Sequence, residues 1–280
     1  MVAALSPSRA SDFMQCPLLY RFRVIDKLPE PPSSAAARGT LVHSVLERLF
    51  DLPATGRTLA EATALLPAQW EAMLEVEPEL RELVGSEPEA LRQWFEDAAG
   101  LVERWFTLED PTRLEPAERE LYVETELDGL TLRGYVDRLD VAPTGEVRVV
   151  DYKTGKSPSE RFESKALFQM KFYALVLWRL RGTVPDMLQL VYLGNSEIVR
   201  YVPDERDLLA TERKLKALWV AIARAASEGD WRPSKSRLCD WCNHRALCPA
   251  FGGTPPPLPE HAADLALDPS RSGEASPDDD

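Results

Sequence analysis

The spacing of apolar residues changes near the middle of the chain, and this change limits the folds that the sequence can adopt. Upstream, the segments 38–50 and 58–108 repeat their apolar residues with the spacing of helices. Downstream, alternating segments separated by turn residues predict five strands: 119–127, 131–141, 146–152, 186–193 and 197–203. Two further helices are predicted over 164–181 and 204–228. The resulting order of helix, three strands, helix, two strands and helix predicts an α/β fold.

Turn and breaker residues set the expected boundaries within this order. Asp128-Gly129 is a typical two-residue hairpin turn between the first two strands. Three prolines are expected to divide 58–108 into several short helices: Pro67, Pro78 and Pro88. The segment 252–280 is rich in proline, alanine, serine and acidic residues, so we expect a disordered acidic tail with a solubilising role.

The charge of the chain is negative overall but unevenly distributed. The 33 basic and 46 acidic residues give a net charge of −13, and the segments 71–100 and 252–280 carry all of this excess. The remaining body can hold a local basic groove, so the acidity does not exclude a nucleic-acid substrate. No apolar run approaches the roughly 18 residues of a membrane span, and the first residues lack a secretory signal pattern. We therefore expect a cytoplasmic protein without a membrane partner, in which four cysteines are not a disulfide framework.

Three charged residues on the second and third predicted strands form a candidate catalytic site. Asp151 and Lys153 share one face because side chains alternate along a strand, and Asp137 can join them from the neighbouring strand. Carboxylates bind hard divalent cations, which polarise a phosphate and lower the pKa of a bound water. A lysine can orient that water or stabilise charge on the phosphate. The set predicts metal-assisted phosphodiester hydrolysis, and the alternative is an ordinary ion pair between Asp151 and Lys153.

The segment after Lys153 also has the appearance of a phosphate-binding loop, in Gly155-Lys156-Ser157. A Walker loop requires a glycine five residues before Gly155, and the sequence has Val150 at that position. The sequence therefore excludes an ATP site of that type.

Two polar pairs at helical spacing are further candidates. His43 and Glu47 lie four residues apart on the helix predicted from Arg38, so they share one face, and a neutral imidazole is a common metal ligand. Gln169 and Tyr173 have the same spacing on the helix that follows the lysine strand. Each pair also has a simpler interpretation: His43 could be a core residue, and Gln169 and Tyr173 could be a detail of a helix surface.

The four cysteines are split between the two ends of the chain. Cys239, Cys242 and Cys248 are close together, whereas 222 residues separate them from Cys16. The three clustered cysteines could form a zinc knuckle with His244 as the fourth ligand. Alternatively, Cys16 folds back and four thiolates bind zinc or an iron–sulfur cluster. The spacing predicts a metal centre without distinguishing between the metals.

Taken together, these motifs resemble those of the RecB-family nucleases in the PD-(D/E)XK superfamily, including AddB-like nuclease domains. The resemblance covers about 5–250 and is carried by ordered segments: LSPSRASDFMQCPLLYRF, GTLVHSVLE, GYVDRLD, DYKTGK, QMKFYAL and CDWCNHRALCP. It implies a restriction-endonuclease-like core, with a central mixed sheet flanked by helices. It also implies one nuclease domain over 1–251, with a helical insertion at 58–112 and a C-terminal iron–sulfur element formed by 231–251 with Cys16.

The resemblance also implies roles for individual residues. A 4Fe-4S cluster that clamps the two ends of the chain together would have these ligands: Cys16, Cys239, Cys242 and Cys248. Mg²⁺ or Mn²⁺ would have these: His43, Asp137, Asp151 and the backbone carbonyl of Tyr152. Lys153 would be the catalytic lysine, and Gln169 and Tyr173 would match a Q-x₃-Y motif that supports the active site and contacts DNA. Glu47 would have a supporting role.

The expected activity is that of a metal-dependent DNA exonuclease, acting on single strands or DNA ends in repair or recombination. The alternatives are a non-catalytic DNA-binding or scaffold protein stabilised by iron–sulfur or zinc, and a nuclease subunit that works with a separate helicase or repair partner. Basic residues near the site are candidate contacts to the DNA backbone: Arg133, Arg138, Lys156, Lys165 and Lys171. Two aromatic residues near them, Tyr135 and Phe162, could stack on bases.

Overall fold

The computed structural model describes residues 3–84, 88–157 and 160–267. Its strands are β1 (Ala3–Leu5), β2 (Glu118–Leu127), β3 (Leu130–Val141), β4 (Val147–Lys153), β5 (Met187–Tyr192) and β6 (Glu197–Tyr201). Its helices are α1 (Pro7–Gln15), α2 (Pro17–Tyr20), α3 (Ser34–Leu49), α4 (Leu59–Val76), α5 (Leu80–Val84), α6 (Pro88–Leu108), α7 (Glu160–Arg181), α8 (Glu205–Glu228) and α9 (Ala262–Leu267). Among these described residues, no helix combines the length and the apolar composition required to cross a bilayer.

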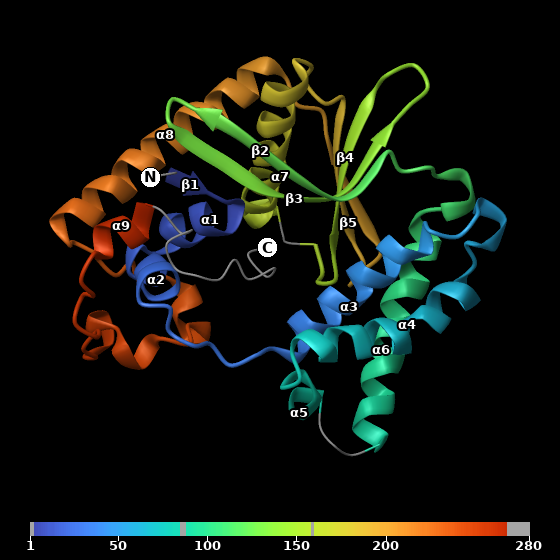
Figure 1. Cartoon of the computed structure of the whole chain (residues 1–280), viewed down its shortest axis with the longest axis horizontal. Helices are drawn as coiled ribbons and strands as arrows, with labels where there is room; N and C mark the ends of the chain where they lie inside the picture. Colours follow the sequence, from blue (N-terminus) through green and yellow to red (C-terminus); the bar gives the residue numbers. More distant parts are fainter. Residues whose placement is uncertain (1–2, 85–87, 158–159, 268–280) are drawn as a thin grey trace.

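A mixed sheet of six strands lies at the centre of the molecule (Figure 1). The long strand β3 pairs with β2 along one side, and on its other side with β1 near its start and β4 near its end. β5 runs parallel to β4, and β6 runs antiparallel to β5. The α/β fold and the mixed sheet are confirmed, and each predicted strand is present. The sequence analysis missed β1, because three residues are too few to show a period.

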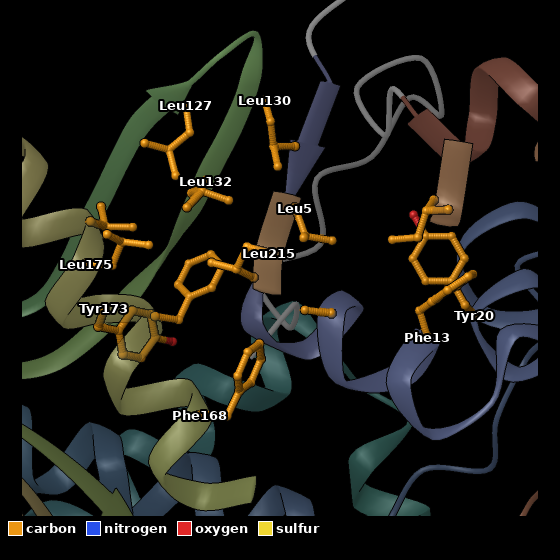
Figure 2. Packing of buried hydrophobic residues seen from close by; sticks show 14 of the residues in the cluster. Leu5, Phe13, Tyr20, Leu127, Leu130, Leu132, Phe168, Tyr173, Leu175 and Leu215 are labelled. Atoms are coloured by element: carbon orange, nitrogen blue, oxygen red, sulfur yellow. The ribbon is translucent and has the colours of Figure 1, made fainter. Parts of the chain in front are cut away.

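The two faces of the sheet bury two separate apolar cores. Alternate residues of β4 divide between them: Val149 packs in the core shared with α1, α7 and α8, and Val150 in the core shared with α3, α4 and α6. Figure 2 shows part of the first core, where Tyr173 and Leu175 of α7 pack near Leu132 of β3. The middle of β4 is buried on both faces and apolar, in Val149 and Val150, whereas its charged residues lie nearer its ends, with Arg148 near the start and Asp151 and Lys153 toward the carboxyl end.

The β2–β3 hairpin forms as the sequence predicts. Asp128 and Gly129 have φ angles of 51° and 83°, both in the left-handed region that a tight two-residue turn requires at these positions. This turn fixes the register in which Tyr122 lies opposite Tyr135 and Val123 lies opposite Gly134.

The predicted break at Pro67 is wrong, whereas the breaks near Pro78 and Pro88 are present. Helix α4 continues through Pro67, although a proline removes one hydrogen bond from a helix interior. The residues on either side explain why the helix persists: Leu66 and Trp70 are buried against α3 and α6. Packing of this apolar face outweighs the lost hydrogen bond.

The described part of the acidic tail packs against the body instead of being disordered. Helix α9 buries Ala262 and Ala266, and the Tyr20 hydroxyl donates a hydrogen bond to the carbonyl of Ala266 over 2.7 Å. The guanidinium of Arg21 donates to the carbonyl of Pro256 over 2.5 Å. A few small apolar residues within a polar, proline-rich segment are therefore enough to dock it. The rest of the predicted tail, 268–280, lies outside the described residues.

Candidate functional site

A cavity of about 650 Å³ lies where α3, β3, β4 and α7 meet. In Figure 1, α7 and α3 lie on opposite sides of β4 and β5, so residues from both helices can reach the end of β4. Most of the predicted site residues line this cavity: His43, Glu47, Asp137, Asp151, Tyr152, Lys153 and Gln169. The structure therefore brings together residues that span 127 positions of the sequence.

Asp151 and Lys153 lie on the same face of β4, as their spacing predicts. The Lys153 ammonium donates a hydrogen bond to Oδ1 of Asp151 over 3.0 Å and lies 2.9 Å from Oδ2. It also donates to Oε1 of Gln169 over 3.0 Å. Gln169 thus holds the lysine from the helix side, and its own amide nitrogen lies 3.4 Å from the hydroxyl of Tyr173.

The Asp151 carboxylate is almost fully buried, with 2% of the residue exposed. The pKa of Asp151 is raised to about 6, mainly by burial; Lys153 opposes this shift and the neighbouring Asp137 contributes to it. A carboxyl with these neighbours is stabilised in its ionised form by any additional positive charge in the cavity.

Lys153 keeps its charge in spite of burial. Burial alone would lower the pKa of Lys153, but the carboxylates of Asp151 and Asp137 outweigh it and the pKa is raised. The side chain is therefore a cation at neutral pH. It can stabilise negative charge on a substrate but cannot take up a proton.

The backbone of Tyr152 connects the other two polar residues of the cavity. Its amide donates a hydrogen bond to Oδ2 of Asp137 over 2.6 Å, and its carbonyl accepts one from Nε2 of His43 over 3.0 Å. Because the carbonyl can only accept, Nε2 is the donor in this contact. Nδ1 lies 3.6 Å from Oδ2 of Asp137. A metal-binding histidine usually donates its second ring N–H in this way to a backbone carbonyl.

Glu120 is a member of the site that the sequence analysis missed. It lies in β2 opposite Asp137 and lines the cavity, and its φ of 42° is in the left-handed region. One ligand atom each of Glu120, Asp137 and His43 lie within 4.8 Å of one another. Two carboxylates and an imidazole are an oxygen-rich donor set that suits a divalent cation.

Arg138 is not a contact to a ligand, because only 1% of it is exposed. Its guanidinium forms two hydrogen bonds to the Glu109 carboxylate, of 2.8 and 2.7 Å, and another to the hydroxyl of Tyr152. Glu109 follows the last residue of α6, so this buried pair ties the helical region to the strand that carries the site. Arg138 also pairs with Asp140 at 3.1 Å, but its bidentate partner Glu109 is distant in sequence.

The other predicted DNA contacts have varied surroundings. Lys156 is exposed and lines the cavity, whereas Lys171 is held by Asp207 at 3.5 Å and by the Tyr201 hydroxyl at 3.0 Å. Arg133 and Tyr135 lie on the same face of β3 as Asp137, and Tyr135 is exposed. The side chains of Lys165 and Phe162 lie outside the described residues.

Tyr173 lies in the core behind the cavity, with 1% of it exposed. A Cβ at Gly134 would stand 2.8 Å from the Tyr173 ring, so β3 can pass this close to α7 only because residue 134 is glycine. The buried position favours a supporting role for Tyr173 over direct contact with a ligand.

A second, small cavity is lined by all four cysteines: Cys16, Cys239, Cys242 and Cys248. Two backbone amides point at its sulfur atoms, with Ser234 N 3.3 Å from Cys16 Sγ and Ser236 N 3.4 Å from Cys239 Sγ. The chain therefore folds its first cysteine onto the other three.

His244 does not line this cavity. Its Nε2 lies 2.8 Å from the carboxylate of Glu30, and its ring packs edge-on against Phe22 at 5.3 Å. The imidazole is buried, with 4% of the residue exposed. This arrangement favours the four-cysteine set over a local knuckle that uses His244.

The sequence matches the PD-(D/E)XK nuclease superfamily over residues 4–249. It is 32% identical to the gene 69 protein of Mycobacterium phage D29 over 270 residues, covering 88% of this chain and 96% of that protein. The gene 69 protein of Mycobacterium phage L5 is 23% identical with the same coverage. The fold is similar to the crystal structure of a candidate exonuclease from Eubacterium rectale, with a TM-score of 0.54, 14% identity, and coverage of 86% of this chain and 88% of that one.

Proposed function

Since the chain belongs to the PD-(D/E)XK nuclease superfamily, we propose that it is a RecB-like, metal-dependent deoxyribonuclease that acts as an exonuclease on single strands. The observation that carries the proposal is the arrangement at the end of β4. Asp151 and Lys153 are in contact there, and the backbone between them holds Asp137 and His43. An ordinary surface ion pair would not be buried in a cavity with two further metal-binding side chains.

The residues of the cavity fit a divalent cation such as Mg²⁺ or Mn²⁺. Asp137, Glu120 and Nδ1 of His43 lie close enough together to contact one ion. Asp151 would join them from β4: its buried Oδ2 lies 2.9 Å from the Lys153 ammonium and, within the described residues, forms no well-directed hydrogen bond. The carbonyl of Tyr152, which now accepts a hydrogen bond from His43, would either orient that imidazole or bind the ion itself. When bound, the cation polarises the scissile phosphate and lowers the pKa of a water in its coordination sphere.

The side chains of the chain supply the remaining chemistry. The Lys153 ammonium stays protonated and stabilises the negative charge that develops on the phosphoryl oxygens. Gln169 fixes the direction of that ammonium through its Oε1, and Tyr173 supports Gln169 from the core. Glu47 also lines the cavity, where its carboxylate can contact water molecules around a bound cation. Lys156 at the rim of the cavity is placed to contact a neighbouring phosphate of the DNA.

We propose further that the four cysteines hold a 4Fe-4S cluster. In a tetrahedral zinc site with Zn–S bonds of about 2.3 Å, the sulfur atoms stand about 3.8 Å apart. Within the described part of the chain, no three of the four sulfur atoms lie within 4.8 Å of one another. The wider spacing favours a larger centre, and the resemblance to cluster-containing nucleases favours iron–sulfur. A role in DNA repair or recombination, with or without a helicase partner, is consistent with this assignment.

The proposal is tested by incubating anaerobically purified wild-type protein with end-labelled single strands and Mg²⁺ or Mn²⁺. We expect mononucleotides or short products to accumulate, and EDTA to abolish the reaction. Asp137→Asn should reduce cleavage about 100-fold or more, because a lost carboxylate weakens the metal site. Glu126→Gln, which changes an exposed glutamate elsewhere on the β2–β3 hairpin, is the matched control. EDTA-resistant cleavage, or an Asp137→Asn variant as active as wild type, would refute the proposal.

A further inference from the structure

The segment that carries the three clustered cysteines presents an unusually exposed aromatic residue. Trp241 has 76% of its surface exposed, the largest fraction among the large apolar residues of the described chain. Leu238 and Phe251, at 42% and 40%, are exposed on the same segment. Trp241 does not line the cysteine cavity, so packing around the sulfur atoms does not account for it.

The segment is also basic within an acidic chain. Residues 231–251 contain four basic residues and one acidic residue, whereas the whole chain has a net charge of −13. Arg245 is paired with Asp240 at 2.8 Å, and it lies 4.4 Å from the ring centre of Phe251. Lys235 lies over the same ring at 4.9 Å. Within the described residues, neither Lys235 nor Arg237 has a carboxylate within 4.0 Å.

Exposed aromatic rings among unpaired cations are the combination that binds single-stranded nucleic acid. Bases stack on the rings and the cations contact phosphates, without dependence on sequence. A duplex keeps its bases stacked inside and cannot use an exposed indole in this way. The apolar residues alone would also suit a protein partner. The positive charge favours a polyanion such as a nucleic acid, because opposite charges attract.

The segment is attached to the same scaffold as the catalytic cavity. The amide of Ser234 donates to the sulfur of Cys16, which lies between α1 and α2. Helix α1 packs against α7, and α7 carries Gln169 into the cavity. In Figure 1 the segment, in orange, lies below α2, on the opposite side of the molecule from α4 and α6.

We propose that Trp241, with Lys235 and Arg237, forms a docking surface for single-stranded nucleic acid outside the catalytic cavity. Trp241 supplies a stacking platform and the two cations supply phosphate contacts. This inference rests on the proposed nuclease function for the identity of the ligand, but its geometry is independent of Asp137, Asp151 and Lys153. The surface would retain a strand between cleavage events.

Binding is measured without cleavage, by fluorescence anisotropy of full-length protein with a labelled oligothymidine in EDTA. Stacking of one base is worth about 1–3 kcal/mol, so Trp241→Ala should raise Kd roughly tenfold, and Trp241→Phe should stay within about threefold of wild type. Lys235→Glu combined with Arg237→Glu should weaken binding and reduce its salt dependence. The matched controls on α8 are Val220→Ala for the apolar residue and Arg206→Glu for the charge, and neither should change Kd.

Two results would overturn the docking surface: Trp241→Ala binding within twofold of wild type, or Trp241→Ala abolishing self-association while leaving strand binding intact. The outcomes for the two proposals are separable. Binding that depends on Trp241, in a protein that cleaves nothing, would refute the nuclease proposal and support the surface. Metal-dependent cleavage by a protein whose Kd is unchanged by Trp241→Ala would support the nuclease proposal and refute the docking surface.

Discussion

The proposed catalytic cavity and the cysteine cavity are built in opposite ways. The first takes its residues from regular strands and helices, and a continuous set of hydrogen bonds runs from His43 through Tyr152 to Asp137. The second is surrounded by three short 3₁₀ turns and the junction of α1 and α2. Among its sulfur atoms, Cys16 Sγ and Cys239 Sγ accept hydrogen bonds from the backbone amides of Ser234 and Ser236.

Under the proposed assignments, this difference predicts which site depends on a bound metal for its stability. In the proposed catalytic cavity the sheet register places the carboxylates of β3 and β4, and Asp151 forms an ion pair with Lys153. In the cysteine cavity, the residues that meet are separated by more than 200 positions, and a bound centre would be their strongest connection. We therefore expect changes in the first region to reduce chemistry and changes in the second to reduce stability.

The largest expected effect is on stability, from Cys16→Ala. With four thiolates on one centre, the closed loop constrains the unfolded chain, and loss of one ligand should cost up to roughly 4 to 5 kcal/mol of unfolding free energy. Denaturant unfolding and visible absorption, measured together, test this. Gln15 is a neighbour that lines the same cavity. Gln15→Ala should keep the visible absorption of the metal centre and most of the free energy of unfolding. A Cys16→Ala variant that keeps both would show that the two ends are not joined by a metal centre.

The next largest effect is on cleavage, from Lys153→Ala. Loss of the ammonium bonded to Asp151 should slow cleavage on the order of 100-fold, equivalent to about 3 kcal/mol of transition-state stabilisation. Stability should change little, because Asp151 can take up a proton once its partner is gone. Single-turnover rates and melting temperatures check both parts, and the control is Arg206→Ala, which removes an exposed cation on α8 that does not line the cavity. If Lys153→Ala cleaved at the wild-type rate, the ion pair between Lys153 and Asp151 would have only a structural role.

A smaller effect is expected from Tyr152→Phe, which tests the link between the helical region and the site. The variant removes the hydroxyl that accepts a hydrogen bond from buried Arg138. A buried donor left without an acceptor costs about 1–3 kcal/mol of unfolding free energy. Tyr122→Phe removes a phenol that bonds Glu124 at the surface, and should cost almost nothing. Equal unfolding free energies for the two variants would exclude the buried link.

The smallest effect concerns Glu30, which joins His244 to the N-terminal region. Its hydrogen bond to Arg23 lowers the pKa of Glu30 to about 2. A carboxyl whose pKa is lowered by folding stabilises the folded state above its unfolded pKa and loses that contribution as the pH falls. Glu30→Gln should therefore cost about 1 kcal/mol at neutral pH, and its difference from wild type should shrink between pH 4.5 and about 2. A difference that does not vary with pH in that window would contradict this assignment.

The sequence predicts elements and site residues where local pattern carries the information. The alternation in β4 and the spacing of Asp151 and Lys153 already place both charges on one face. Gln169 reaches the lysine because α7 packs across that face. Glu120 could not be found in this way, because it is one of four glutamates in β2 and only the tertiary fold brings it to Asp137. The burial of Arg138 was missed for a similar reason, since Glu109, which pairs with it in addition to nearby Asp140, is 29 positions away.

The most direct test of the account is the time course of single-strand cleavage by Asp151→Asn and wild type with Mn²⁺, alongside their melting temperatures. Asparagine keeps the shape of the side chain but removes the charge that would hold the cation and pair with Lys153. We predict that cleavage falls on the order of 100-fold or more while the melting temperature stays at or above that of wild type. Cleavage at the wild-type rate by a folded Asp151→Asn protein would contradict the assignment of this cavity as the active site.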